Sequence, residues 1–448
     1  MKIIIVGAGR IGRNLAKSLV EENHEVYLIE KNEERVKKLG DKLDIKVILG
    51  NGADPDMLLR AQVEQADLVI AVTTNDETNL VVCSLAASFG AKRRIARVRN
   101  TSLKETLSRS TENNYGIDEF INPELLASEA IVKTILTPGA SEVADFAGGK
   151  ILLRGFDVLD NSPLGGIKME DLRDEDFPWP FLIVSIIRQG KVIIPKGDAS
   201  IEKGDHIYVL LPAASLGEFL TYVNPDIHMP KKAVIYGATI TGTQVAKKLS
   251  LTNINTIMIE ENKQIAEEVA TRLDRVTVIN GPPTEADILT ECGIEVADAY
   301  VATSNDDDAN LISSVLAKKM GAKSTIITTQ NPDYVTIINE LRIDAIINPH
   351  LLAVKQILHL VRGRVISSVT KFMETDAEVL ELVPEDEAPI TKDLLKNIKF
   401  PRSAIVGAVC RGSQAMLANG ETQIRPGDNV IVFCDKNSTN KIQQFFTG

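Results

Sequence analysis

The stretch IIIVGAGRIGRNLAKSL, residues 3–19, decides the fold of this 448-residue chain, and AVIYGATITGTQVAKKL, residues 233–249, repeats it. In both stretches a short apolar run leads into glycines and then into a helical pattern. This is the order of strand, tight turn and helix that opens a parallel α/β sheet. Gly7 aligns with Gly237, an offset of 230 residues (237 − 7). Solenoid repeats have periods of roughly 20–50 residues, so this repeat indicates a duplicated domain.

Each half begins with alternating strand and helix patterns. In the first half a helical stripe covers Ile11–Glu22, and further helices are expected around Asn79–Phe89 and from Pro123 to about Leu136. Between them, apolar runs predict six strands: Ile3–Val6, Val26–Ile29, Val47–Leu49, Leu68–Val72, Ile95–Val98 and Glu119–Ile121. This order predicts an α/β fold with two doubly wound Rossmann-like parallel sheets, one in each half.

The pattern changes after each sheet to short strands separated by Gly and Pro turns. Within residues 143–212 the expected strands are Ile151–Leu153, Phe181–Ile187, Lys191–Ile194 and His206–Leu211. Gly204-Asp205 returns as Gly427-Asp428, so the small domain is duplicated as well. We therefore expect a tandem duplication with Rossmann-like domains at 1–137 and 231–363, each followed by a small α+β domain, at 138–222 and 364–448.

Composition places the chain among ordinary soluble proteins, with 44% hydrophobic and 25% charged residues. No apolar run approaches the ~20 residues that a membrane helix needs, so we expect a cytoplasmic protein. The net charge of −11 argues against a nucleic-acid partner, because phosphate contacts need a basic face. None of the four cysteines forms a CxxC pair, and we expect buried reduced thiols at Cys83, Cys292, Cys410 and Cys434.

The motif Gly7-x-Gly9-x-x-Gly12 follows a predicted strand and opens a predicted helix, the context in which it indicates dinucleotide binding. Gly7 allows the tight turn, Gly9 lets the backbone approach a pyrophosphate, and Gly12 lets the helix pack on the sheet. Glu30 ends the second strand 18 residues after Gly12. Its carboxylate suits ribose hydroxyls and would repel a 2′-phosphate, which favours NAD over NADP. The alternative is a glycine-rich turn with an empty groove.

Polar residues follow other strands of the first sheet, and Arg10 and Arg13 flank the glycine loop. Because ligands bind outside the carboxyl ends of the strands, we expect these loops to line the crevice. The candidate nucleotide contacts are Gly7, Gly9, Arg10, Ile11, Gly12, Glu30, Asn51, Gly52, Thr73, Thr74, Asn75 and Arg97. Helix capping by Asn and Asp, and a surface ion pair for Arg97, remain alternatives.

The second copy keeps Gly237, Gly242 and Glu260 but has Thr239 in place of the middle glycine. The Cβ of Thr239 lies where backbone would approach a pyrophosphate, so we expect the fold to be retained without NAD. The second-site candidates are Gly237, Thr239, Gly242, Glu260 and Thr303.

Catalytic and metal-binding patterns are lacking. The five histidines stand in no Ser/His/Asp or HExxH arrangement, and we name no catalytic residue. The acidic run Asp306–Asp308 suits the start of a helix better than a cation site, because metal ligands normally converge from several segments.

The motifs of the first lobe, taken together, resemble those of the TrkA family, the peripheral NAD-binding subunits of Trk-type potassium uptake systems. Its repeated unit is similar to the regulator-of-potassium-conductance (RCK) module. The resemblance covers essentially the whole chain and rests on GAGRIG at Gly7–Gly12, Glu30, GNGAD at Gly50–Asp54, TTNDETN at Thr73–Asn79, ARVRN at Ala96–Asn100 and INP at Ile121–Pro123.

The resemblance implies a cytoplasmic subunit, peripherally attached to the inner face of the cell membrane through a potassium-translocating membrane subunit. It also implies a homotetramer that binds NAD(H), or ATP and ADP, and changes its geometry when the ligand is exchanged. By this analogy Gly7, Gly9, Gly12, Glu30, Asn51, Thr73 and Arg97 hold the nucleotide.

We therefore carry three hypotheses. The first is a ligand-gated regulatory subunit for potassium transport, with the helices at Leu125–Leu136 and Leu351–Val361 as crossover elements. The second is an NAD-dependent oxidoreductase, which the duplicated architecture and the missing acid–base group oppose. The third is a nucleotide or redox sensor with a different partner.

Overall fold

The computed structural model describes the whole chain except residues 41–44, 104–114, 175–178, 332–340, 342, 362–365, 372–376, 402, 413, 436–437 and 448. Each of its two compact units draws on both halves of the sequence. The first unit contains Met1–Val132 and Lys231–Leu358, and the second contains Lys133–Pro230 and His359–Gly448. The first unit therefore holds the two Rossmann-like lobes, and the second holds the two small domains.

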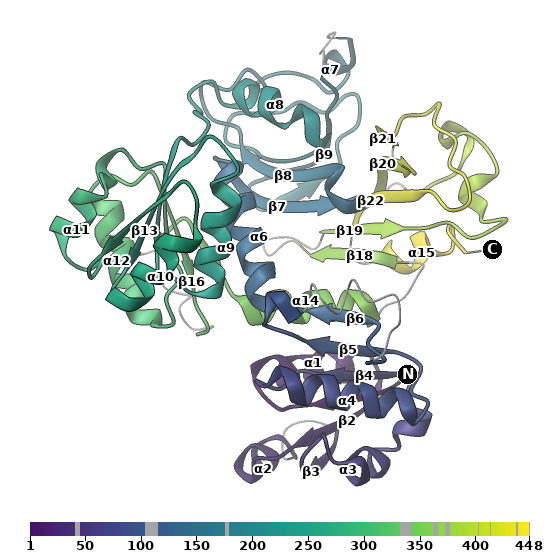
Figure 1. Cartoon of the computed structure of the whole chain (residues 1–448). Coiled ribbons are helices and arrows are strands. Elements are labelled where there is room, and N and C mark those ends of the chain that lie inside the picture. Colours follow the sequence, from purple (N-terminus) through teal and green to yellow (C-terminus); the bar gives the residue numbers. More distant parts are fainter. Residues whose placement is uncertain are drawn as a thin grey trace. The chain divides into compact units, whose positions relative to one another are not determined.

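The first lobe is a six-stranded parallel sheet in the order β3-β2-β1-β4-β5-β6 (Figure 1). Its strands are β1 (Lys2–Val6), β2 (Glu25–Glu30), β3 (Lys46–Leu49), β4 (Leu68–Ala71), β5 (Arg94–Arg97) and β6 (Glu119–Ile121). All six predicted strands are confirmed. The order reverses between β1 and β4, which creates the crevice expected of a doubly wound sheet.

Burial on both faces explains why the central strand is continuously apolar. Ile3, Ile4 and Ile5 are all fully buried, as parallel sheets covered by helices require. The helices of this lobe are α1 (Arg10–Glu21), α2 (Glu33–Gly40), α3 (Pro55–Arg60), α4 (Asp76–Ser88) and α6 (Pro123–Leu136), with a 3₁₀ turn η1 at Val63–Gln65. Helix α1 packs on the sheet through Leu15 and Leu19, one helical turn apart.

The second lobe repeats this topology in the order β14-β13-β12-β15-β16-β17. Its strands are β12 (Lys232–Tyr236), β13 (Asn255–Glu260), β14 (Val276–Asn280), β15 (Ala299–Ala302), β16 (Ser324–Thr328) and β17 (Ala345–Ile347). Its helices are α9 (Ile240–Leu249), α10 (Lys263–Arg272), α11 (Ala286–Glu291), α12 (Asp307–Lys319) and α14 (Pro349–Val361). The predicted duplication is therefore confirmed at the level of strand order.

Each small domain is a five-stranded antiparallel sheet. The first has the order β10-β9-β11-β8-β7, with strands β7 (Ala140–Phe146), β8 (Ile151–Asp157), β9 (Leu182–Arg188), β10 (Lys191–Ile193) and β11 (His206–Pro212). The second has the order β18-β19-β22-β20-β21, with strands β18 (Ile366–Lys371), β19 (Ala377–Leu382), β20 (Ala404–Arg411), β21 (Gln414–Leu417) and β22 (Asn429–Asp435). Short helices α7 (Asp171–Asp174), α8 (Leu216–Val223) and α15 (Thr439–Gln443) complete them.

A shared apolar core joins the two small sheets within the second unit. It includes Phe146 and Tyr208 from the first sheet and Ile431 and Phe433 from the second. The rings of Tyr208 and Phe433 have centroids 6.4 Å apart. The small domains therefore bury their apolar faces against each other, which a single small domain could not do alone.

Burial also decides the state of the cysteines. All four are unpaired and buried, as predicted. Burial raises the pKa of Cys83 to about 12, so its thiol is inert at neutral pH.

Among the described helices, none has the length and apolar character to cross a membrane.

Candidate functional site

The first crevice opens where strand order reverses, at the carboxyl ends of β1 and β4. Gly7 ends β1 with φ at +106°, a conformation that favours glycine. A Cβ on Gly7 would lie 3.1 Å from the backbone nitrogen of Thr73, and one on Gly12 would lie 1.9 Å from the carbonyl oxygen of Gly7. These two glycines let the loop after β1, the loop after β4 and helix α1 approach one another closely.

Gly9 has a different role, because its surroundings are open. A Cβ there would meet nothing within 4 Å. Gly9 is the N-cap of α1, and no side chain caps the helix at this point. The first N–H groups of a helix lack partners within the helix and attract anions. The first lobe therefore presents an open, uncapped helix N-terminus, which suits a pyrophosphate.

Glu30 braces this loop from the end of β2. Its side chain is only 5% exposed. One carboxylate oxygen accepts a hydrogen bond from the backbone N–H of Ala8 at 2.7 Å, and the other accepts from Asn32 N–H at 2.9 Å. A carboxylate has about four acceptor sites, so Glu30 retains capacity for ribose hydroxyls.

The other predicted contacts differ in whether their side chains are exposed at the crevice, buried or used as helix caps. Asn51 and Thr74 carry exposed side chains at the strand ends, and a Cβ on Gly52 would lie 2.1 Å from Val6 Cγ1. The side chain of Ile11 is buried in the core, so only its backbone can face a ligand. Asn75 is the N-cap of α4 and accepts from Thr78 N–H at 2.6 Å, which confirms capping as one role of this loop.

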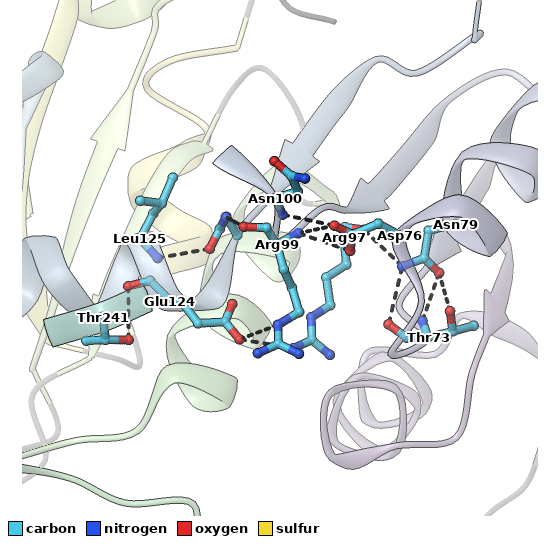
Figure 2. A network of polar contacts seen from close by, with 10 residues as sticks. Thr73, Asp76, Asn79, Arg97, Arg99, Asn100, Glu124, Leu125 and Thr241 are labelled. Atoms are coloured by element: carbon cyan, nitrogen blue, oxygen red, sulfur yellow. Dashed lines mark hydrogen bonds and ion pairs between the residues drawn. The ribbon is translucent and has the colours of Figure 1, made fainter. Parts of the chain in front are cut away.

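Asn79, which the sequence analysis did not select, holds the crevice loop through hydrogen bonds to Thr73 (Figure 2). It is fully buried on α4 and accepts hydrogen bonds from Thr73 N–H at 2.9 Å and from Thr73 Oγ1 at 2.7 Å. Its amide donates to the carbonyl oxygens of Thr73 and Arg97, the latter at 2.9 Å. Asn310 makes matching contacts with Ser304 and Thr328 in the second lobe, so the repeat itself was the available signal.

Asp76 holds the next strand end in place. Its carboxylate accepts from the backbone N–H groups of Arg99 and Asn100, at 2.9 to 3.0 Å (Figure 2). Asp307 accepts in the same way from Gln330 and Asn331 in the second lobe. These repeated carboxylates keep the ends of β5 and β16 close to the starts of α4 and α12.

Arg97 lies at the end of β5 in an ion pair, as the alternative for this residue proposed, but the pair is buried rather than on the surface. The side chain is 6% exposed, and its guanidinium is 3.4 Å from the carboxylate of Glu124, in the first turn of α6 (Figure 2). Arg99 contacts the same carboxylate oxygen at 2.9 Å. Burial lowers the pKa of Arg97, and the nearby charge of Glu124 opposes that shift. The crevice is thus connected to the predicted crossover helix.

In the second lobe a side chain caps the N-terminus of the corresponding helix, α9. Thr239 is the N-cap of α9, and its hydroxyl accepts from Gly242 N–H at 3.2 Å and donates to the carbonyl oxygen of Thr303 at 2.9 Å. Gly237 retains a positive φ of +92°, and Glu260 accepts from Ala238 N–H at 2.8 Å, as Glu30 does from Ala8. The turn is kept, while one of the helix N–H groups that could bind an anion is capped internally by Thr239.

Thr303 and Tyr236 further distinguish the second crevice. The hydroxyl of Thr303 is buried and donates to the carbonyl oxygens of Tyr236 and Gly237. Tyr236 stands where the first lobe has Val6, and its hydroxyl donates to Glu261 at 2.9 Å. Burial raises the pKa of Tyr236 to about 12, so it remains a neutral donor. Polar groups of the second crevice therefore partner one another.

The acidic run at the start of α12 acts as a cap. Asp306 accepts from the backbone N–H groups of Asp308 and Ala309 at 3.0 Å. In the part of the chain that the structure describes, no three His, Cys, Asp or Glu side chains gather in a way that could hold a metal ion.

A pocket of about 560 Å³ lies between the two lobes of the first unit. The guanidinium of Arg10 donates to the carbonyl oxygen of Gln330, which joins the glycine loop of the first lobe to the second. The pocket is lined by Arg10, Arg13, Asn14, Asp307, Gln330, Asn331, Asn348, His350 and Leu351. The second lobe thus contributes side chains next to the first crevice.

Both halves of the chain match the same two families. Residues 3–123 and 233–349 match the TrkA-N domain, and residues 153–224 and 379–447 match the TrkA-C domain. The Trk system potassium uptake protein TrkA of Vibrio alginolyticus is 32% identical over 440 residues, covering 97% of this chain and 95% of that protein. The Trk system potassium uptake protein TrkA homolog of Archaeoglobus fulgidus is 32% identical over 448 residues and 100% of both chains.

Solved structures share the fold. The GsuK channel bound to NAD superposes with a TM-score of 0.63 at 16% identity, covering 99% of this chain and 78% of that one. GsuK bound to ADP superposes with a TM-score of 0.51 at 15% identity, covering 80% and 68%. At these identities the similarity concerns the fold alone.

Proposed function

Because this chain belongs to the TrkA family, with TrkA-N and TrkA-C domains in tandem, we propose that it is the nucleotide-binding regulatory subunit of a Trk-type potassium uptake system. In this proposal it is cytoplasmic, assembles as a homotetramer and attaches peripherally to a potassium-translocating membrane protein. The TrkA relatives named above are potassium uptake proteins and not enzymes, which supports a regulatory role over an oxidoreductase.

The observation that best supports a nucleotide ligand is the uncapped N-terminus of α1. Gly9 leaves open space beside free helix N–H groups, and Glu30 stands at the ribose end of the loop. NAD(H) fits this arrangement, and the carboxylate disfavours the 2′-phosphate of NADP. The GsuK structures bound to NAD and to ADP support the same class of ligand, with ATP or ADP as the alternative nucleotide. The contacts we propose are Gly7, Gly9, Arg10, Gly12, Glu30, Asn51, Gly52, Thr73, Thr74, Asn75 and Arg97, with the backbone of Ile11.

The proposed mechanism is a population shift. A ligand in the first crevice contacts the loop after β4 and the end of β5, where Arg97 is paired with Glu124 at the start of α6. Helix α6 continues from the first unit into the second. A nucleotide that binds one arrangement of these loops more tightly shifts the protein toward that arrangement, by its differential affinity.

We expect the purified chain to bind one NADH per chain, at the first crevice, without consuming it. The reason is that Thr239 caps α9 while α1 remains open. Calorimetry gives the stoichiometry, and absorbance at the nicotinamide band during incubation with candidate carbonyl compounds reports turnover. Turnover would support the oxidoreductase hypothesis, and equal filling of both crevices would contradict the assignment of a single site.

We expect the full chain to co-purify with a potassium-translocating membrane protein from its own cell. A tetramer in the absence of that partner, measured by light scattering, is the second expected result. Co-purification with an unrelated soluble partner would favour the hypothesis of a sensor with a different target.

A further inference from the structure

The pocket between the Rossmann-like lobes brings charged groups of both copies together. Arg10 and Arg13 line it from the first lobe, while Asp307 and His350 line it from the second. Arg10 and Arg13 lie at the N-terminal end of α1, beside the open position at Gly9. The pocket lined by the two arginines at the start of α1 is therefore also lined by a histidine that lies more than 300 residues away in the sequence.

Buried polar atoms without partners collect around this histidine. Within the described residues, Nδ1 of His350, Nε of Arg97 and Oε2 of Glu124 are buried and have no hydrogen-bond partner. The charges of Arg97, Arg99 and Glu124 all act on the imidazole, as does that of Arg10. Unpaired buried polar atoms are rare in folded proteins and point to a missing ligand or ion. The arginines outnumber the carboxylates here, so that ligand should be an anion.

We propose that His350 makes ligand binding in this pocket proton-linked: a phosphate group beside Arg10 and Arg13 binds more tightly when the imidazole is protonated. This inference rests on the proposed nucleotide function and adds its regulation by pH. A phosphate group accepts hydrogen bonds from guanidinium and imidazolium groups, and either a bound nucleotide or free phosphate can supply it. His350 would give the second lobe a direct role in binding at the first.

The direction of the pH effect follows from the surroundings of His350. Burial, and after it the positive charges of Arg97 and Arg10, lower the pKa of His350 to about 4, so the ligand-free imidazole is neutral at neutral pH. A phosphate group beside the ring favours its charged form and raises that pKa. The complex then binds a proton that the free protein does not. Affinity therefore rises as pH falls through the pKa of the complex, by at most about tenfold per pH unit.

The test measures the Kd of NAD for the full chain by calorimetry from about pH 8 down to about pH 5.5, where histidine titrates. The pyrophosphate of NAD keeps its charge over this range. We expect Kd to fall by about threefold to tenfold toward the lower pH, with proton uptake on binding. Repeating the titration in two buffers of different ionisation enthalpy measures that uptake on the unmodified protein, independently of any variant.

His350→Gln should abolish both the pH dependence and the proton uptake, because glutamine forms hydrogen bonds but does not titrate here. His228→Gln is the matched control, since His228 is exposed in the connector of the second unit, and it should keep the original pH profile. Sulfate, which also keeps its charge, should compete with NAD more strongly at low pH.

Two outcomes would overturn the inference in different ways. NAD binding with the same pH profile in His350→Gln and in the unmodified chain would refute the role of His350 and leave the proposed function standing. Failure of both NAD and sulfate to bind at any pH would refute the proposed function together with this inference.

Discussion

Replacing Gly9 by aspartate is expected to weaken NAD binding by at least about 100-fold while leaving the fold intact. The backbone of Gly9 has φ −68° and ψ −169°, an extended conformation that any residue adopts, and a Cβ there meets nothing within 4 Å. Aspartate is also a favoured N-cap residue, so its carboxylate would accept from the open N–H groups of α1. It would thereby occupy the donors and place a negative charge where the pyrophosphate binds.

The same change in the second copy is the control. Thr239→Asp replaces one N-cap by another but removes the hydrogen bond donated to the carbonyl oxygen of Thr303, so we expect a modest loss of stability and no appreciable change in NAD affinity. Calorimetry measures binding for both variants, and thermal unfolding verifies that each is folded. A Gly9→Asp variant that is folded and binds NAD as tightly as the unmodified chain would refute the site. Equal losses in both variants would instead indicate two working crevices.

The local features of this fold could be predicted from sequence because they depend on short-range patterns. The fully apolar run before Gly7 predicts a central parallel strand, and the glycine spacing predicts the turn and the helix that follow. The repeat then predicts the second lobe. Strand β7 (Ala140–Phe146) is not among the predicted strands, because its sequence ASEVADF contains no continuous apolar run and no regular alternation of polar and apolar residues. It forms part of the sheet by pairing antiparallel with β8.

The polar framework of the crevice could not be predicted in the same way. Arg97 was selected as a ligand contact, yet its carboxylate partner, Glu124, lies 27 residues further along, in the first turn of α6. His350 lines a pocket with Arg10 and Arg13 only because the two lobes pack within one unit. No local periodicity encodes such contacts. In contrast, the sequence does predict that the N-termini of α1 and α9 differ, because Gly9 stands in one and Thr239 in the other. The hydrogen bond by which Thr239 caps α9 is seen only in the structure.

Replacing Asn79 by leucine is expected to lower the free energy of unfolding by roughly 3–5 kcal/mol and to abolish NAD binding. Leucine has a similar size but forms no hydrogen bonds. The backbone N–H and hydroxyl of Thr73 would lose their acceptor, and the carbonyl oxygen of Arg97 would lose its donor. Each buried polar group left unpaired costs about 1–3 kcal/mol. The loop after β4 would then no longer be held against the end of β5.

Asn310→Leu separates the structural role of this asparagine from its effect on the ligand. Asn310 makes three of the four corresponding hydrogen bonds, with the backbone of Ser304 and Thr328 but not with a hydroxyl, so its loss should lower stability by a comparable or slightly smaller amount. Because α9 is capped by Thr239, the change should leave NAD affinity at the first crevice nearly unaltered. Chemical denaturation measures the stability of both variants, and calorimetry at low temperature measures binding while each remains folded. If Asn79→Leu binds NAD normally, the loop after β4 is not part of the site. If Asn310→Leu loses binding to the same extent, the loop after β15 is as important for the ligand as the loop after β4.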